Sequence, residues 1–235
     1  MDNPNWIHVS ADTRGRKEVL RARSKGSKTV YEPIKILPAI SKVNSVFSAA
    51  VDSDFRSTVA AQILKWEGRF KGGKLQVYQL PSGDGGGAYE VAGINVRYHP
   101  MKALELKTLI DKGKHSEAER LATVYIAEET DSVAKWTSIP SVECFLRDCA
   151  FNRGLMGAAK IYQIALKVPV DGLIGSDTLT AAASWNIATS DSLLTNLRAA
   201  REKYERKWVG RSETSKFWNG LVNRWNNCEE FSRRF

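Results

Sequence analysis

The clearest hydrophobic pattern in the chain covers residues 54–67, where large apolar side chains recur at helical spacing. The recurring positions, which share one face of an α-helix, are Phe55, Val59, Ile63 and Trp66. The preceding run Asp52-Ser53-Asp54 offers side-chain oxygens that can cap a first helical turn. Gly68 is the kind of residue at which a helix commonly ends. The pattern therefore predicts a helix over 54–67.

A different pattern follows, with polar and apolar residues in alternation. The stretch KLQVYQL (74–80) alternates and contains Val and Tyr, so it predicts a strand. PSGDGGG (81–87) predicts a loop, because proline and four glycines cannot continue a strand. AYEVAGINVRY (88–98) predicts the returning strand. We expect the helix to lead into a β-hairpin.

Beyond Pro100 the chain has helical periodicity to its end. The predicted helices cover 101–112, 115–129, 140–151, 155–167, 176–186, 191–208 and 214–231. Ser116 and Glu119 have the spacing of a capping box, and Pro140 suits a first helical turn. Asp191 and Thr214 are the expected caps of the last two helices. The chain is predicted to be α+β and mostly α, with one small β-hairpin and a helical C-terminal lobe.

Residues 1–50 show little clear period. They are basic, and they contain Pro33 and Pro38. We expect a mostly irregular extension or linker, followed by one main domain over 51–235.

The charge balance is basic. Lys and Arg number 35 against 26 Asp and Glu, which gives a formal net charge of +9. Such a surface favours a polyanion, whether nucleic acid, an anionic membrane or an anionic cell-wall polymer. Charge alone does not choose among these partners.

Cysteine and histidine usage argues against a disulfide scaffold or a metal site. The three cysteines are Cys144, Cys149 and Cys228, and the first two lie in an apolar helical run, where we interpret them as core residues. The sequence contains neither HExxH nor CxxC, so no metal is implied. It has neither an apolar signal core nor a run of 18 apolar residues. We expect a chain made in the cytoplasm that is exported or released by other means.

Three carboxylates surround the predicted corner between helix and hairpin: Glu67, Asp84 and Glu90. Glycoside hydrolysis needs one protonated carboxyl and one ionised carboxylate across a cleft. Apolar neighbours disfavour the charged form of a carboxyl, so Glu67, beside Trp66 and Phe70, is the candidate acid. In a glycine loop, backbone N–H groups can hold Asp84 ionised.

Each acid also has a plainer interpretation when taken alone. Glu67 can be a solvated residue at a helix end, Asp84 can form an Asx turn, and Glu90 can lie on an exposed strand edge. The glycine loop lacks the GKS or GKT that a phosphate-binding loop needs. The order of the three acids is what favours catalysis.

Four stretches resemble one protein family in the family's own order. KWEGRF (65–70) resembles the EGGY-type opening of the phage muramidases of glycoside hydrolase family 108, which belong to the lysozyme-like superfamily. DGGGAYEVAGIN (84–95) is similar to their glycine-rich second motif. LRDCAFNRG (146–154) is similar to a later helix segment. GAAKIYQIALKVPVDGLIGSDTLTAA (157–182) resembles their peptidoglycan-associated helical region, and VDGLIGSDT is its most specific part.

The resemblance implies a lysozyme-like fold and places the family's catalytic glutamate at Glu67. The spacing from Glu67 to the glycine motif is longer than in the family, and Glu90 replaces the family's threonine. A threonine would orient the attacking water, whereas a glutamate can deprotonate it. Glu90 also resembles the plant-type chitinase branch of the superfamily, and Asp84 the chitosanase branch. We expect Glu90 to be the base, with Asp84 as second choice.

Several further residues are candidates for sugar binding. Asn95 and Tyr98 can line a sugar groove, and the rings that can stack on sugars are Tyr78, Tyr89 and Trp136. Strand surface or core positions explain the same residues without a ligand. Asp148 and Asn152 are interpreted first as a structural polar pair, with Asn152 also a candidate for substrate contact.

The resulting hypothesis is an N-acetylmuramidase that cleaves the MurNAc-GlcNAc β-1,4 bond of bacterial peptidoglycan without a cofactor. A phage endolysin released by a holin and a secreted antibacterial effector both fit, and an effector would have an immunity or inhibitor protein as partner. The alternatives are a non-catalytic peptidoglycan-binding or particle-docking module, a chitinase-like or chitosanase-like glycosidase, and nucleic-acid binding. This last alternative rests on charge alone and lacks a recognition motif.

Overall fold

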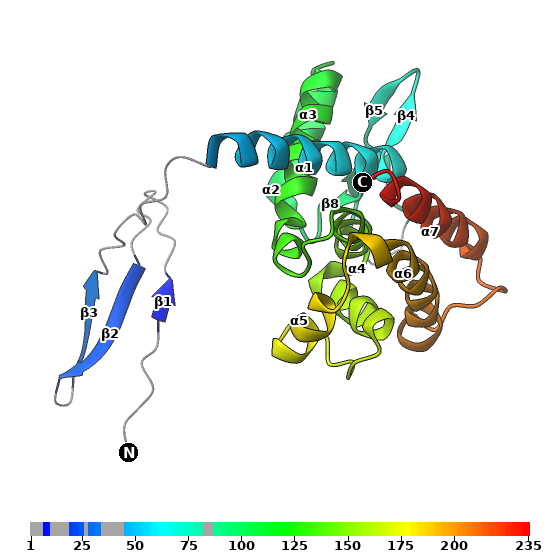
Figure 1. The fold of residues 1–235 in the computed structure, drawn as a ribbon. Helices are drawn as coiled ribbons and strands as arrows, with labels where there is room; N and C mark the ends of the chain where they lie inside the picture. The colour runs from blue at the N-terminus through cyan, green and yellow to red at the C-terminus, as the bar shows by residue number, and fades with distance from the viewer. Residues whose placement is uncertain (1–6, 10–18, 26–27, 34–44, 82–86) are drawn as a thin grey trace. The chain divides into compact units, whose positions relative to one another are not determined.

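The chain forms two compact units, Met1–Ala49 and Ala50–Phe235 (Figure 1). This computed structural model describes residues 7–9, 19–25, 28–33, 45–81 and 87–235. Each unit is considered by itself. The fold class predicted from the sequence is confirmed, because helices dominate and the described strands form small antiparallel sheets.

The described part of the first unit is an antiparallel sheet with strand order β1-β2-β3. Its strands are Ile7–Val9, Val19–Lys25 and Lys28–Pro33. The prediction of mostly irregular chain over 1–50 is therefore wrong for the described residues. A strand depends on hydrogen bonds to a neighbouring strand, and these short segments show no long local period that would reveal the pairing.

Helix α1 spans Ser45–Glu67 and so begins well before residue 54. The run Asp52-Ser53-Asp54 lies inside the helix and does not cap it. The end at Glu67 is as predicted, and the Gly68 amide donates to the Leu64 carbonyl at 2.7 Å. Gly68 is needed here for space, since a Cβ would lie 2.5 Å from the Phe70 ring and 2.8 Å from the Leu64 carbonyl oxygen.

Two small sheets replace the single hairpin expected over 74–98. Strands β4 (Arg69–Lys71) and β5 (Lys74–Gln76) pair around Gly72 and Gly73. Both glycines have positive φ, as a tight two-residue hairpin turn requires. The strand predicted over 74–80 begins after this glycine pair, so the turn and β4 were not predicted.

The second sheet contains β6 (Tyr78–Gln79), β7 (Tyr89–Val91) and β8 (Ile94–Asn95). The expected pairing of 74–80 with 88–98 is retained only between β6 and β7. The segment 88–98 then turns back on itself at Ala92 and Gly93, which have φ of 53° and 76°. This second turn puts β8 beside β7.

Helices form the remainder of the second unit. The α-helices are α2 (Pro100–Asp111), α3 (His115–Glu129), α4 (Pro140–Leu166), α5 (Ser176–Ala183), α6 (Ser190–Tyr204) and α7 (Trp218–Ser232). Short 3-10 turns cover Asp131–Lys135 and Ile187–Thr189, and a π-helical turn covers Glu205–Val209. In α4, Gly154 has φ 67° and ψ 170°, and it separates the two helices predicted over 140–151 and 155–167.

The predicted caps had mixed outcomes. Pro140 begins α4 as expected. The capping box at Ser116 is wrong, because α3 begins at His115 and Glu119 instead accepts from the Leu75 amide at 3.3 Å. Asp191 lies in the first turn of α6 and pairs with Arg233, and Thr214 precedes the start of α7.

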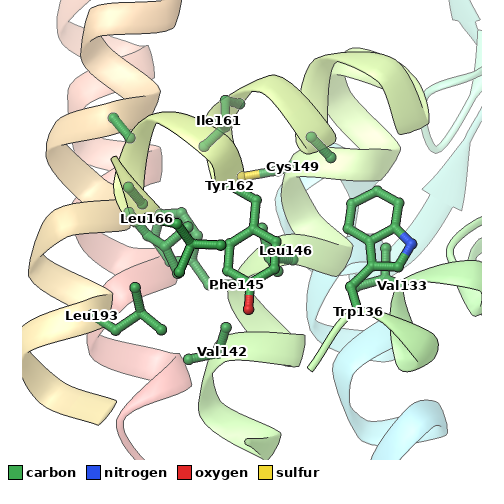
Figure 2. Packing of buried hydrophobic residues seen from close by; sticks show 14 of the residues in the cluster. Val133, Trp136, Val142, Phe145, Leu146, Cys149, Ile161, Tyr162, Leu166 and Leu193 are labelled. Carbon is green, nitrogen blue, oxygen red and sulfur yellow. The ribbon is translucent and has the colours of Figure 1, made fainter. Parts of the chain in front are cut away.

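The core consists of two clusters of buried side chains. One packs α4 against α6 and includes Phe145, Tyr162 and Leu193 (Figure 2). The other joins α1, the small sheets, α2 and α3, and its members include Ile63 and Leu106. Trp66 packs against both clusters, so the end of α1 lies where they meet.

The three cysteines are free and buried, which confirms Cys144 and Cys149 as core residues. Within the described residues, no helix is long and apolar enough to cross a membrane.

Candidate active site

Glu67 ends α1 with a side chain that is 24% exposed and held by polar partners. Asn152 donates from Nδ2 to Glu67 Oε1 at 2.7 Å. Arg224 Nη2 lies 3.0 Å from the same oxygen. Helices α1, α4 and α7 therefore converge on one carboxylate.

The neighbours that the sequence suggested for Glu67 are arranged differently. Trp66 faces Phe231 and the guanidinium of Arg224, which lies 4.9 Å from its ring centroid. Phe70 is 41% exposed on β4. The expected apolar shield is therefore replaced by the amide and guanidinium groups of α4 and α7.

Arg224 is itself held by a fully buried carboxylate, Asp148. Its Nε and Nη2 bond Asp148 Oδ1 at 3.1 and 2.5 Å, and Arg201 Nη1 bonds Asp148 Oδ2. Burial alone would raise the pKa of Asp148, but Arg224 and Arg201 outweigh burial and lower that pKa to about 2. Burial would likewise lower the pKa of Arg224, but Asp148 and Glu67 raise it. The four charged groups form a network of two carboxylates and two guanidiniums.

The local geometry of α4 explains why Asp148 and Asn152 act together. Residues four apart lie on one face of a helix. Asp148 can therefore hold Arg224 while Asn152, one turn later, holds Glu67. The interpretation of these residues as a structural polar pair is correct for Asp148, whereas Asn152 contacts the candidate catalytic acid directly.

Gly93 brings the turn between β7 and β8 against the other oxygen of Glu67. A Cβ at Gly93 would lie 3.4 Å from Glu67 Oε2 and 3.0 Å from the Phe151 ring. The backbone there has φ +76°, which also favours glycine. Among the described residues, the hydrogen bonds and ion pairs of the Glu67 carboxylate go to Oε1.

A pocket of about 380 Å³ has Gly93 and Phe151 in its lining; Glu67 itself is not in the lining but lies behind Gly93. This volume is within the range of small-molecule sites. Backbone and side chains from β8, α2, α3 and α4 line it: Gly93, Ile94, Asn95, Tyr98, His99, Lys102, Glu129, Ala150, Phe151, Gly154 and Leu155. The break in α4 at Gly154 is part of its wall.

Two of the predicted sugar-binding residues line this pocket, Asn95 and Tyr98. Tyr98 is 67% exposed. Tyr78 and Tyr89 lie on β6 and β7, half-buried and outside the pocket lining. Trp136 is packed in the core beside Val133 and is 8% exposed, so its ring does not face a groove (Figure 2).

Of the two candidate bases, Glu90 lies within the described residues and Asp84 does not. Glu90 is half-buried on β7, opposite Tyr78 on one side and Asn95 on the other. It therefore shares a sheet with Asn95, which lines the pocket, and the turn that joins their strands contains Gly93, the residue beside Glu67. Asp84 lies outside the described residues.

Sequence reasoning missed Arg224, Arg201 and Gly93. The only available signal was the spacing of Asp148 and Asn152, which predicts one polar face on α4. Nothing local to α7 identifies Arg224 as the partner of a glutamate so far away in the chain. Among the residues that the structure describes, no group of three or more His, Cys, Asp or Glu could hold a metal ion.

The comparisons with known proteins place the fold. The second unit is an α+β fold in which helices dominate. The chain is similar in structure to Brucella abortus SagA. The two share 21% sequence identity with a TM-score of 0.54, over 78% of this chain and 96% of SagA. No protein-family model matches the chain, and neither does any curated protein. The similarity to SagA shows a shared fold.

Proposed function

We propose that this protein is a peptidoglycan hydrolase, an N-acetylmuramidase that cleaves the MurNAc-GlcNAc β-1,4 bond. The observation that carries the proposal is the placement of Glu67. The carboxylate that the family resemblance marks as catalytic ends a helix, lies beside Gly93 of a pocket lining, and is held through one oxygen by Asn152 and Arg224.

Glu67 acts as the general acid and protonates the glycosidic oxygen. Asn152 and Arg224 fix Oε1, which leaves Oε2 beside Gly93 as the atom that carries the proton. Because Oε1 is already held in place, the carboxyl group loses less conformational freedom on reaching the transition state. As Glu67 Oε2 donates its proton, the leaving sugar departs and negative charge returns to a carboxylate that already has a guanidinium beside it.

Glu90 is the proposed base, with Asp84 as the alternative. In a single displacement, water deprotonated by the base bonds to the anomeric carbon as the bond to the leaving oxygen breaks, which inverts that centre and needs carboxyl groups roughly 6.5–9.5 Å apart; a pair about 5 Å apart would favour retention. Asn95 and Tyr98 contact the sugar, because both line the pocket and Tyr98 presents an exposed ring.

The proposed setting is the bacterial cell wall, reached by holin-assisted release or by secretion. In the second case an immunity protein would protect the producing cell. The net charge of +9 supports retention on an anionic polymer, with an affinity that falls as salt rises.

A second candidate function is a peptidoglycan-binding module without catalysis. The ion pair between Glu67 and Arg224 is the observation that favours it. An ion pair requires an ionised carboxylate, whereas a general acid must carry a proton. In this alternative, Glu67 only helps to join α1 to α7.

The test is digestion of purified peptidoglycan followed by mass spectrometry of the soluble products. Glu67→Gln should reduce product release by at least about a hundredfold, since it removes the proton donor but keeps an oxygen for Asn152. The matched control is Glu230→Gln, which changes an exposed glutamate on α7 and should leave the rate unchanged.

The products separate the possible reactions. Fragments with hydrated reducing-end MurNAc support the muramidase, and anhydro-MurNAc ends would mean a lytic transglycosylase that needs no water-activating base. Release of products from chitin but not from peptidoglycan would support a chitinase-like enzyme. Binding without products from any protein variant would support the module.

A further inference from the structure

Arg153 and Glu205 form a buried ion pair next to the site, and the proposed mechanism uses neither residue. The Glu205 side chain is fully buried, and that of Arg153 is 18% exposed. Arg153 donates from Nε to Glu205 Oε1, and Arg211 Nη1 lies 3.3 Å from Glu205 Oε2. Both oxygens of the buried carboxylate therefore have a guanidinium partner, as a charge in the interior requires.

A second nitrogen of Arg153 reaches the backbone of Asn152. Nη1 donates to the Asn152 carbonyl at 2.9 Å, while Nε stays bound to Glu205. Helix α4 is broken two residues after Asn152, at Gly154. The last carbonyls before a helix end lack partners in a following turn, and a side chain can supply one. Arg153 therefore caps the half of α4 that carries Asn152, and Glu205 holds the cap.

The π-helical turn after α6 gives Glu205 its place. Glu205 is the first residue of this turn, which continues α6 directly. Such turns are rare and frequently occur at functional sites. The packing around the pair is close, because a Cβ added to Gly157 would lie 2.6 Å from Arg153 Cβ and 3.1 Å from the Tyr204 hydroxyl. Arg153 is thus confined to the orientation that reaches both of its partners.

One helical segment supports both groups that contact Glu67 Oε1. Arg201 on α6 and Glu205 at its end are four residues apart and so share a face. Arg201 binds Asp148, the carboxylate that holds one partner of Glu67. Glu205 binds Arg153, which holds the backbone of the other partner. Two buried ion pairs of opposite polarity therefore fix the first half of α4 against α6.

We infer that Glu205 and Arg153 are positioning residues for the proposed hydrolysis: they hold the Asn152 carbonyl, and through it the side-chain amide that donates to Glu67 Oε1. Neither residue lines the pocket, so neither touches the sugar. The inference rests on the proposed function for the reaction that is served. Apolar residues of similar volume often stabilise a fold as well as a buried ion pair does. The loss of this pair should therefore appear in catalysis more than in stability.

The test combines Arg153→Met with Glu205→Met, which leaves neither charge buried alone and should keep the unfolding temperature close to that of the wild type. On soluble peptidoglycan fragments, kcat should fall about tenfold with less than about twofold change in KM, because a displaced Asn152 orients the acid poorly. The matched control is Glu202→Met with Arg206→Met, a largely exposed ion pair on the same segment. It should change kcat by less than about twofold.

A double-mutant cycle separates positioning from general damage to the fold. In an Asn152→Ala background the two methionines should change kcat by less than about twofold, since the group through which the pair acts is gone. A further tenfold loss in that background would overturn the inference. Arg153→Lys is a milder second variant, which keeps the charge opposite Glu205 but has one nitrogen where arginine uses two. It should lower kcat at least about threefold. An unchanged kcat in both variants would also overturn the inference.

NMR of the Asn152 side-chain amide tests the positioning without any turnover. Its resonances are identified by their disappearance in Asn152→Ala, and Glu67→Ala, which removes the acceptor, provides the reference shift. The two methionines should move these resonances toward that reference, whereas the control pair should leave them in place. Resonances that stay unchanged would overturn the inference. If they move but the wild type releases no sugar, the proposed hydrolysis fails while the positioning of Asn152 by the pair stands.

Discussion

At the scale of single residues, the site depends on which atoms surround Glu67. Asn152 Nδ2 and Arg224 Nη2 both approach Oε1, at 2.7 and 3.0 Å. Asn152 is neutral and forms one directed hydrogen bond, so its removal isolates the effect of orientation from the effect of charge.

We therefore expect Asn152→Ala to lower kcat about 10–100-fold with little change in KM, because a hydrogen bond to a charged group contributes about 1.5–3 kcal/mol. Steady-state kinetics on soluble peptidoglycan fragments provides the measurement. Asn227→Ala, at an exposed position on α7, is the control. An unchanged kcat would remove Asn152 from the catalytic machinery.

Asp148 is the residue whose titration should affect stability. Its pKa in the folded state is about 2, against an ordinary value of 3.8, because Arg224 and Arg201 outweigh burial. A lowered folded-state pKa adds stability that is complete above pH 4 and is lost as the pH falls through about 2. The shift corresponds to about 2 kcal/mol.

Urea unfolding between pH 5 and pH 2 should show this loss in the wild type. Asp148→Asn should be destabilised by about 3–5 kcal/mol at pH 7, since it leaves the fully buried Arg201 guanidinium without its carboxylate and Arg224 with Glu67 alone. It should also lack the Asp148 part of the acid dependence. Parallel pH curves for the two proteins would contradict the assignment.

At the scale of elements, the broken helix α4 shapes the site. Its first half carries Asp148 and Asn152, and its second half carries Tyr162 and Leu166 of the core. The break is at Gly154, whose φ of 67° and ψ of 170° are accessible almost only to glycine. Nothing lies within 4 Å of the place where a Cβ would be, so the requirement is conformational.

Gly154→Ala should therefore lower the free energy of unfolding by about 1–3 kcal/mol. Gly220→Ala, in ordinary helical conformation on α7 and also in open space, should raise it by up to about 1 kcal/mol. Chemical denaturation of the two variants measures both changes. A loss of the same size at both positions would mean that the break tolerates a side chain.

At the scale of the molecule, the second unit has two core clusters joined by α4 and by Trp66. Cys144 belongs to one cluster and Cys149 to the other, although both lie on α4. A helix shared in this way couples the clusters, so we expect Ala50–Phe235 to unfold in one cooperative transition.

Leu106→Ala tests this coupling, because Leu106 is fully buried in the cluster around α2. The substitution should destabilise the unit by about 2–5 kcal/mol. Fluorescence of Trp225 on α7 and far-UV circular dichroism should report the same lowered Tm. An unchanged fluorescence transition would show that the clusters unfold independently.

How well the sequence predicts the structure also differs from one kind of feature to another. The end of α1 at Glu67 and the Gly154 break follow from local preferences, as does the role of Pro140 at the start of α4. The strand segments are predicted less well, because the Gly72-Gly73 turn lies just before the strand predicted over 74–80 and the Ala92-Gly93 turn lies inside the strand predicted over 88–98. Caps failed where a candidate side chain found a distant partner instead, as Glu119 did with Leu75 and Asp191 with Arg233.

The sequence by itself determined the mostly helical α+β class, the helix that ends at Glu67, and the polar face formed by Asp148 and Asn152. Each of these depends on residues a few positions apart. Only the tertiary structure decided that Arg224 and Gly93 meet Glu67 and that Trp136 is core. These facts depend on packing between helices far apart in the chain, which no local pattern encodes.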